Sequence, residues 1–139
     1  MRIIYFALSA LLLLLTALWL SSYTHHSSVG IDHDHETDSG VLHYYYRLNW
    51  TGNGSVWIGY GSSRVKDSES RQLEKFDPAS ALLKPAQPLP KSATRWNRFG
   101  FWYINSSKPT PVFWVGVPSW LPVLLLVSII LVVRRVKRE

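Results

Sequence analysis

The sequence has no cysteine among its 139 residues. A disulfide framework, a thiolate metal cluster and a cysteine nucleophile are therefore all excluded. Formal charge is also absent from two long stretches, one between Arg2 and Asp32 and the other from Pro109 through Val133. Hydrophobic residues make up 47% of the chain and are concentrated in these two stretches. This uneven distribution argues against a soluble enzyme with a single core.

Each uncharged stretch contains an apolar run that predicts a transmembrane helix. Residues 3–20 include 16 apolar residues of 18, close to the length that crosses roughly 30 Å of hydrocarbon. We expect this run to be an uncleaved signal anchor, because the apolar region of a cleaved signal peptide is usually about 7–15 residues long. The second run, 118–133, is shorter, so the arginines that follow it would have to snorkel to complete the span.

The distribution of basic residues predicts the orientation of both helices. The tail 134–139 contains four Lys or Arg residues, and Arg2 lies beside the terminal amine. By the positive-inside rule, residues 1–2 and 134–139 are cytoplasmic and residues 21–117 lie outside. The predicted location is the cell inner membrane, with two passes. Much of the net charge of +6 belongs to the tail, so it does not indicate nucleic-acid binding.

Between the helices, the sequence predicts a polar tether followed by a small β domain. Residues 21–40 are rich in Ser, His and Asp and have too few apolar side chains to fold alone. Residues 41–117 are predicted to form about four antiparallel strands, with a possible short helix over 67–76 and an irregular Pro-rich connection over 78–91. The overall fold class is membrane α + β, with two transmembrane helices flanking the β domain.

The clearest strand signal is a hairpin with a turn at Asn53-Gly54. Asn-Gly favours a two-residue type I′ turn, which would place Trp50 opposite Trp57. The alternation of apolar and polar side chains before the turn has the period of 2 that a half-buried strand shows. It involves Leu42, Tyr44, Tyr46, Leu48 and Trp50. Two further strands are predicted within 95–104 and over 111–117.

One polar cluster in the tether has the residue types of a metal site. Imidazole and carboxylate groups bind Zn²⁺, Cu²⁺ or Ni²⁺, although the spacing here matches no known site. The alternatives are a hydrated spacer, which we favour, and a segment that changes conformation when its histidines become charged. The candidate ligands are His25, His26, Asp32, His33, Asp34, His35 and Glu36. No catalytic motif occurs, so we expect no enzymatic activity and no cofactor.

Three segments near the C-terminus carry a resemblance: 98–103 (RFGFWY), 117–125 (VPSWLPVLL) and the basic pair Arg134-Arg135. In these segments the chain resembles a group of small uncharacterised two-helix membrane proteins of planctomycete-like bacteria. The resemblance implies a bacterial envelope protein and supplies no catalytic residue. Some members continue into a cysteine-rich, zinc-ribbon-like segment that this sequence lacks, so no metal function is implied.

The sequence therefore predicts an integral membrane protein with an interaction or structural role. Its expected partners are the lipid bilayer and either another protein or a second copy of the chain, and nucleic acid is not expected. The alternative function is metal binding or pH sensing through the His/Asp-rich tether.

Overall fold

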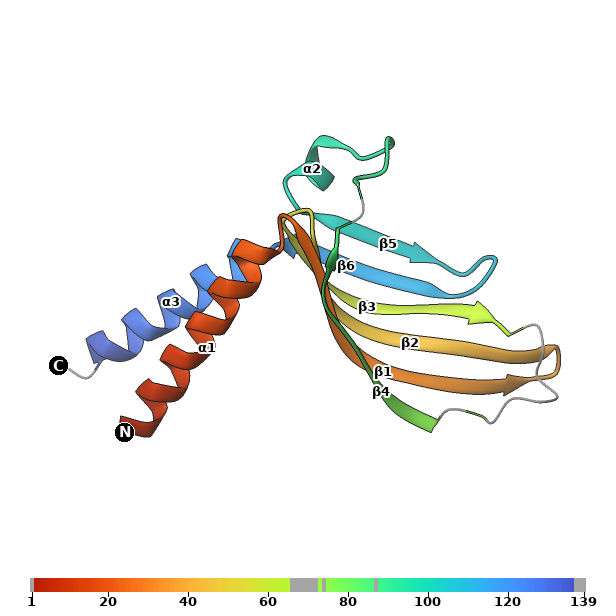
Figure 1. Ribbon diagram of the computed structural model, residues 1–139, viewed down its shortest axis with the longest axis horizontal. Coiled ribbons are helices and arrows are strands. Elements are labelled where there is room, and N and C mark those ends of the chain that lie inside the picture. Colours follow the sequence, from red (N-terminus) through yellow and green to blue (C-terminus); the bar gives the residue numbers. More distant parts are fainter. Residues whose placement is uncertain (1, 66–72, 74, 87, 137–139) are drawn as a thin grey trace.

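The computed structural model describes residues 2–65, 73, 75–86 and 88–136. Two long helices extend from one end of an antiparallel sheet (Figure 1). The elements in chain order are α1 Arg2–Ser21, β1 His25–Thr37, β2 Gly40–Thr51, β3 Ser55–Arg64, β4 Lys75–Pro85, α2 Arg95–Arg98, β5 Trp102–Ser106, β6 Val112–Pro118 and α3 Trp120–Val136. The predicted combination of an apolar N-terminal helix with an antiparallel sheet is confirmed.

The sheet has more strands than the sequence predicted. Its strand order is β4-β1-β2-β3-β6-β5, and every neighbouring pair is antiparallel. Six strands take the place of about four because two segments expected to be irregular, the tether and part of the Pro-rich connection, join the sheet as β1 and β4. The sheet is thereby extended on the β2 side, where our prediction ended it.

Strand β1 corrects the predicted tether over 21–40. Its residues 25–37 pair with β2 from His26 to Thr37 and with β4 from His25 to His33. A segment with neighbours on both sides satisfies its backbone hydrogen bonds without needing many apolar side chains. The low apolar content of this segment therefore did not prevent it from folding.

Strand β4 corrects the first half of the predicted Pro-rich connection, 78–91. Its two prolines, Pro78 and Pro85, belong to a strand at the edge of the sheet, where a missing N–H is tolerated because no further strand needs it. The possible short helix over 67–76 lies mostly outside the described residues, and Lys75 and Phe76 begin β4 instead.

The hairpin of β2 and β3 is present, but its register differs by one residue from the prediction. Trp50 lies opposite Val56 rather than Trp57. The reason is a three-residue loop, 52–54, in place of a two-residue turn. Both of its glycines have positive φ, +79° and +80°, a conformation that costs glycine little.

The segment before the last strand is only partly extended. A capping box at Thr94 starts the four-residue helix α2, so the strand predicted within 95–104 begins only at Trp102. Hydroxyl caps of this kind satisfy the first backbone donors of a helix. The strand predicted over 111–117 corresponds closely to β6, and the helix after it begins at Trp120.

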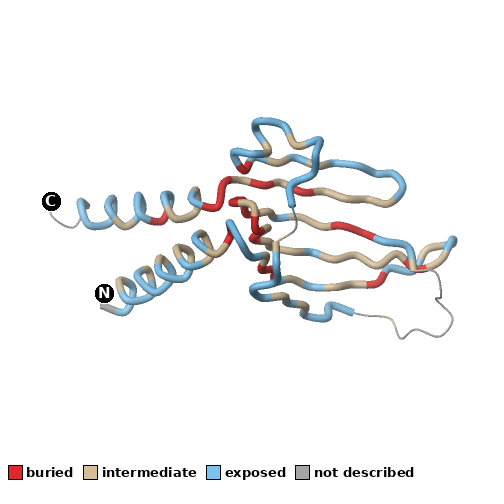
Figure 2. The backbone as a smooth tube through the Cα atoms, turned by 45° about the horizontal axis from the view of Figure 1, so that its top comes forward, coloured by how far each residue is buried: buried red, intermediate tan, exposed pale blue. Residues whose placement is uncertain are grey.

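The two long helices lie side by side, and both chain ends are at their far end (Figures 1 and 2). Among the described residues, only Ile3–Ser21 in α1 is a helix long and apolar enough to cross a membrane, by length and composition. A signal sequence passes the same test. Helix α3 has 17 residues and falls short of it, so one candidate span is found rather than two.

A small buried junction joins both helices to the sheet. The backbone of Gly54 accepts from the N–H of Ser119 at 2.9 Å and donates to the carbonyl of Ser22 at 2.7 Å. The hydroxyls of Ser22 and Ser119 are 2.7 Å apart. Figure 2 shows buried positions gathered here. The buried hydrophobic side chains elsewhere are few: Val41, Trp50, Val56, Trp114 and Leu126.

Candidate functional surfaces

The sheet has two faces of different character, because alternate residues of each strand point to opposite sides. We call one the Trp face; the pairing places on it Asp32, Asp34, His43, Tyr45, Arg47, Trp57, Trp102 and Trp114. We call the other the Tyr face; the same pairing places on it Val29, Ile31, Tyr44, Tyr46, Leu48, Ile58, Tyr60 and Phe113.

On the Trp face, large rings lie over glycines of neighbouring strands. A Cβ at Gly116 would be 2.8 Å from the indole of Trp57, and a Cβ at Gly61 would overlap the ring of Tyr45. The rings of Trp57 and Trp102 are 4.9 Å apart between centroids. Aromatic residues that cover strand glycines compensate for the packing that glycine cannot supply. This face is therefore shaped by its aromatic side chains.

A charged cluster occupies the same face nearer the free end of the sheet. His43 Nδ1 lies 2.7 Å from Asp34 Oδ1, and the side chain of Asp34 is fully buried. Nε2 of His43 is 3.9 Å from Asp32, which also pairs with Arg47. The guanidinium of Arg47 lies 5.9 Å from the ring centre of Tyr45. Buried carboxylates require such partners, so the cluster accounts for the acidic residues within β1.

His43 and Arg47 were not predicted from the sequence as members of this cluster. They belong to β2 and become neighbours of Asp32 and Asp34 only through the pairing of β1 with β2. The available signal was the alternation in β1 itself, where acidic residues occupy every second position from Asp32 to Glu36. That alternation has the period of a strand.

The structure distributes the seven predicted metal ligands over both faces. Four lie on the Trp face, namely His26, Asp32, Asp34 and Glu36, and three on the Tyr face, namely His25, His33 and His35. His33 stacks on Phe76 with ring centres 4.8 Å apart. Within the part of the chain that the structure describes, no group of three or more metal-type ligands is found. Metal binding remains a prediction without structural support.

A cleft opens on the Trp face at the end of the sheet nearest the helices. Its volume is about 520 Å³. Its lining comes from β1, the hairpin of β2 and β3, β5, the end of β4 and the prolines that follow β4. The described lining residues are His26, Thr51, Asn53, Trp57, Lys84, Pro85, Pro88, Pro90, Trp102 and Ile104.

Hydroxyl groups at the edge of the cleft hold the amide of Asn53. Its Oδ1 accepts from Ser55 Oγ at 2.6 Å and also from the hydroxyl of Thr51. Ser55 Oγ in turn accepts from Trp57 Nε1 at 2.9 Å. Because both lone pairs of Oδ1 are engaged, the Nδ2 group is the part of the Asn53 side chain that can donate hydrogen bonds to another molecule. The loop 52–54 is thereby fixed against the wall formed by Trp57.

The Tyr face carries a shallow apolar groove of about 430 Å³. It crosses β1, β2 and β3, and several of its large side chains are exposed: Val29 by 47%, Ile31 by 42%, Tyr46 by 44% and Ile58 by 63%. Contiguous apolar patches of this kind on a folded domain mark contact with another molecule.

No protein-family model, curated protein or solved structure matches this chain. The resemblance to two-helix bacterial membrane proteins therefore stays a prediction. The helix pair, the apolar groove and the cleft are the features that bear on function.

Proposed function

We propose that the chain is a two-pass protein of the cell inner membrane, with both termini in the cytoplasm, that displays its sheet outside and acts by binding rather than catalysis. The observation that carries this proposal is the helix pair. Helix α1 is long and apolar enough to span a bilayer, and α3 lies beside it and leaves the sheet at the same junction. A membrane that encloses α1 therefore also encloses α3.

The length of α3 is compatible with this arrangement. Its 17 residues extend over about 25 Å at 1.5 Å per residue, a few ångströms less than a typical hydrocarbon core. Arg134 and Arg135 lie in its last turn, where long basic side chains reach the headgroup layer. Their charge also favours the cytoplasmic side for this end.

Aromatic side chains surround the junction where the outer surface of the membrane would lie. Trp19 Nε1 donates to the hydroxyl of Tyr23 at 3.0 Å, and Trp120 begins α3. In and after α2, Trp96 is 69% exposed and Phe99 is 70% exposed. The amphipathic rings of Trp and Tyr prefer the headgroup layer, so Trp19, Tyr23, Trp96 and Trp120 support a sheet held close to the bilayer.

The Tyr face supplies the binding role in this proposal. A membrane-attached sheet with an uncovered apolar groove gains stability when a second chain covers it, because burial removes apolar surface from water. Two copies anchored in one bilayer meet with their sheets at the same height. We therefore propose a second copy of the chain as the occupant of the groove.

Single cysteines test the topology, since the natural chain has none. Ser39→Cys lies in the turn between β1 and β2, and Arg135→Cys lies near the end of α3. In intact cells, a membrane-impermeant maleimide is expected to label the cysteine at position 39 and to label the cysteine at position 135 only after permeabilisation. Labelling at position 135 without permeabilisation would overturn the two-pass arrangement.

Photocrosslinking tests the groove. A photoreactive residue at Ile58, on the Tyr face, is expected to crosslink in native membranes to a product of twice the chain mass. The same residue at Ser63, which is exposed on the Trp face, is the matched control and is expected to give little of this product. Equal yields at both positions, or none at position 58, would contradict the proposed dimer.

A further inference from the structure

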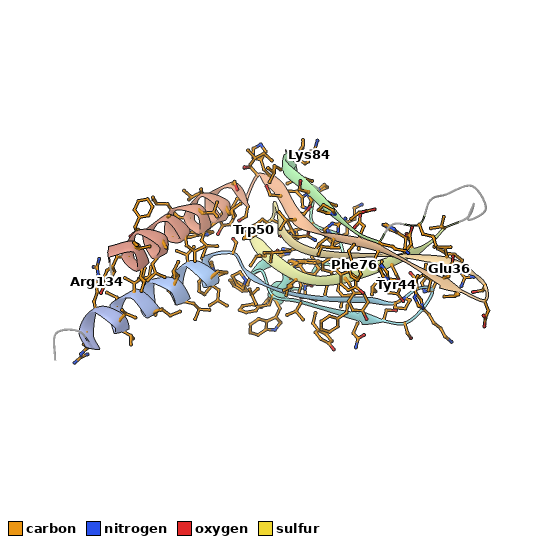
Figure 3. All side chains as sticks on the ribbon, turned by 90° about the horizontal axis from the view of Figure 1, so that it is seen from below. Glu36, Tyr44, Trp50, Phe76, Lys84 and Arg134 are labelled. Carbon is orange, nitrogen blue, oxygen red and sulfur yellow. The ribbon has the colours of Figure 1, made fainter. Side chains whose placement is uncertain are left out.

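The cleft on the Trp face is located beside the ends of both long helices. Thr51 and Asn53 line it, and the next residue, Gly54, is the backbone group that binds Ser22 after α1 and Ser119 before α3. Lys84, another lining residue, lies at the end of β4 nearest the helices (Figure 3). If α1 and α3 cross a membrane, the cleft is at the level of the lipid headgroups.

The polar groups of the cleft are mainly hydrogen-bond donors. Lys84 contributes an ammonium group, His26 an imidazole and Asn53 the free Nδ2 of its amide. No described lining residue is Asp or Glu. A site with one fixed positive charge, several donors and no carboxylate favours an anionic, oxygen-rich ligand.

The indole of Trp102 adds a further unsatisfied donor. It lines the cleft, and its Nε1 is buried without a hydrogen-bond acceptor among the described residues. A buried donor without a partner is unfavourable, so such groups call for an acceptor from water or a ligand.

The remaining walls are apolar. The rings of Trp57 and Trp102, 4.9 Å apart between centroids, line the cleft together with Ile104, Pro85, Pro88 and Pro90. Apolar walls with a few fixed polar groups are typical of small-molecule sites. This combination fits a group with carbon atoms on one side and anionic oxygens on the other.

We propose that this cleft binds the anionic headgroup of a membrane lipid, with Lys84 and His26 at the phosphate oxygens and the indoles against the glycerol. The proposal depends on the membrane attachment proposed above, because that attachment brings headgroups to the cleft. A lysine near an anionic bilayer surface is attracted to it, and the donors of the cleft add hydrogen bonds to that attraction.

Native mass spectrometry of the full-length chain tests the proposal. The protein is incubated in detergent with equal amounts of phosphatidylglycerol and phosphatidylcholine. The expected result is preferential retention of phosphatidylglycerol, weakened about tenfold in Lys84→Gln, as for the loss of one charged hydrogen bond. The matched control is Lys108→Gln, which removes the same charge from the turn between β5 and β6 and is expected to leave retention unchanged.

A further variant and a folding measurement separate the loss of lipid binding from a loss of folding. Lys84→Arg retains the charge and is expected to keep most of the binding, and unchanged melting temperatures confirm that each variant folds. Equal retention of the two lipids, or an equal loss in Lys84→Gln and Lys108→Gln, would overturn the site. Glycerol 1-phosphate and inorganic phosphate are the soluble probes; binding of either as tightly as the lipid would overturn a lipid as the ligand.

The binding measurement in detergent does not require the predicted topology, whereas the maleimide experiment does not require the cleft. A failure of lipid retention with correct labelling at positions 39 and 135 would refute only the headgroup site. Incorrect labelling with intact lipid retention would refute only the two-pass arrangement.

Discussion

At the scale of single residues, the sheet depends on side chains that fill the space above glycines. Tyr45 lies over Gly61 in the neighbouring strand, and Trp57 lies over Gly116. These contacts join β2, β3 and β6 on one face, which has few buried aliphatic residues. The glycines are therefore part of the packing rather than weak points of the strands.

The pair Tyr45 and Gly61 gives a direct test of this packing. Gly61→Ala introduces a methyl group where the Tyr45 ring lies, and overpacking of this kind costs about 1–3 kcal/mol. We expect a lower melting temperature in detergent for Gly61→Ala. The cost should shrink in the double variant with Tyr45→Ala, because the clash is then gone. An equal cost with and without the Tyr45 ring would contradict the proposed contact.

The buried carboxylate of Asp34 is a second residue on which the sheet depends. It is paired with His43 at 2.7 Å, and removing one member of a buried hydrogen-bonded pair leaves the other without its partner. We expect Asp34→Ala to lower the free energy of unfolding by about 1–3 kcal/mol. Asp38→Ala changes an exposed carboxylate of the adjoining turn and should have little effect. Denaturant unfolding of both variants in the same detergent measures the difference.

At the scale of elements, β1 is the segment on which the sequence and the structure differ most. It is an interior strand that is hydrogen-bonded to β2 and β4, yet it contains only Val29 and Ile31 as large aliphatic residues. Two of its three acidic side chains, Asp32 and Asp34, are paired with Arg47 and His43 from the next strand. An interior strand can therefore be polar when a neighbouring strand supplies the opposite charges.

Proline substitution distinguishes the strand from a tether. Val29→Pro removes a backbone donor and constrains φ within an interior strand, where proline is not accommodated. We expect the variant to lose its cooperative unfolding transition or to accumulate poorly. Leu89→Pro places the same residue in the irregular segment after β4 and should be tolerated. Normal folding of Val29→Pro would favour the unpaired tether and contradict β1.

Part of the fold could be predicted from the sequence because its signals are local. The apolar run that forms α1, the alternation over 42–50 and the strand from Val112 all follow from residues near one another in the chain. The charged cluster and the cleft could not be predicted. Both depend on how the strands are arranged in the folded sheet. Lys84, Trp57 and Trp102 belong to three different strands, and they line one cleft only in the folded sheet.

The exact register of the hairpin also could not be predicted from the sequence. Asn53-Gly54 is a strong turn signal, but Gly52 also adopts a positive φ and lengthens the loop by one residue. A shift of one residue exchanges the two faces of a strand. As a result Trp57 points toward the cleft, and Val56 takes the position opposite Trp50.

At the scale of the whole molecule, two kinds of surface require different surroundings. The long helices expose large apolar side chains around most of their circumference, for example Ile3, Phe6 and Leu13, whereas the sheet exposes polar groups along with its groove. The junction at Ser22, Gly54 and Ser119 separates these two regions. The proposed membrane boundary at the junction would place each region in the solvent that suits it.

Leucine substitutions in α3 test whether the two helices are packed together. Leu126 is 7% exposed and Leu124 is 55% exposed, and α3 packs against α1. Leu126→Ala should leave a gap between the helices and lower the free energy of unfolding by about 2 kcal/mol. Leu124→Ala should cost less than about 0.5 kcal/mol, because detergent or lipid fills the space. Thermal melting of both variants provides the comparison. Equal losses would mean that α3 is surrounded by lipid on all sides, and the sheet would then be attached to two independent helices rather than to a packed pair.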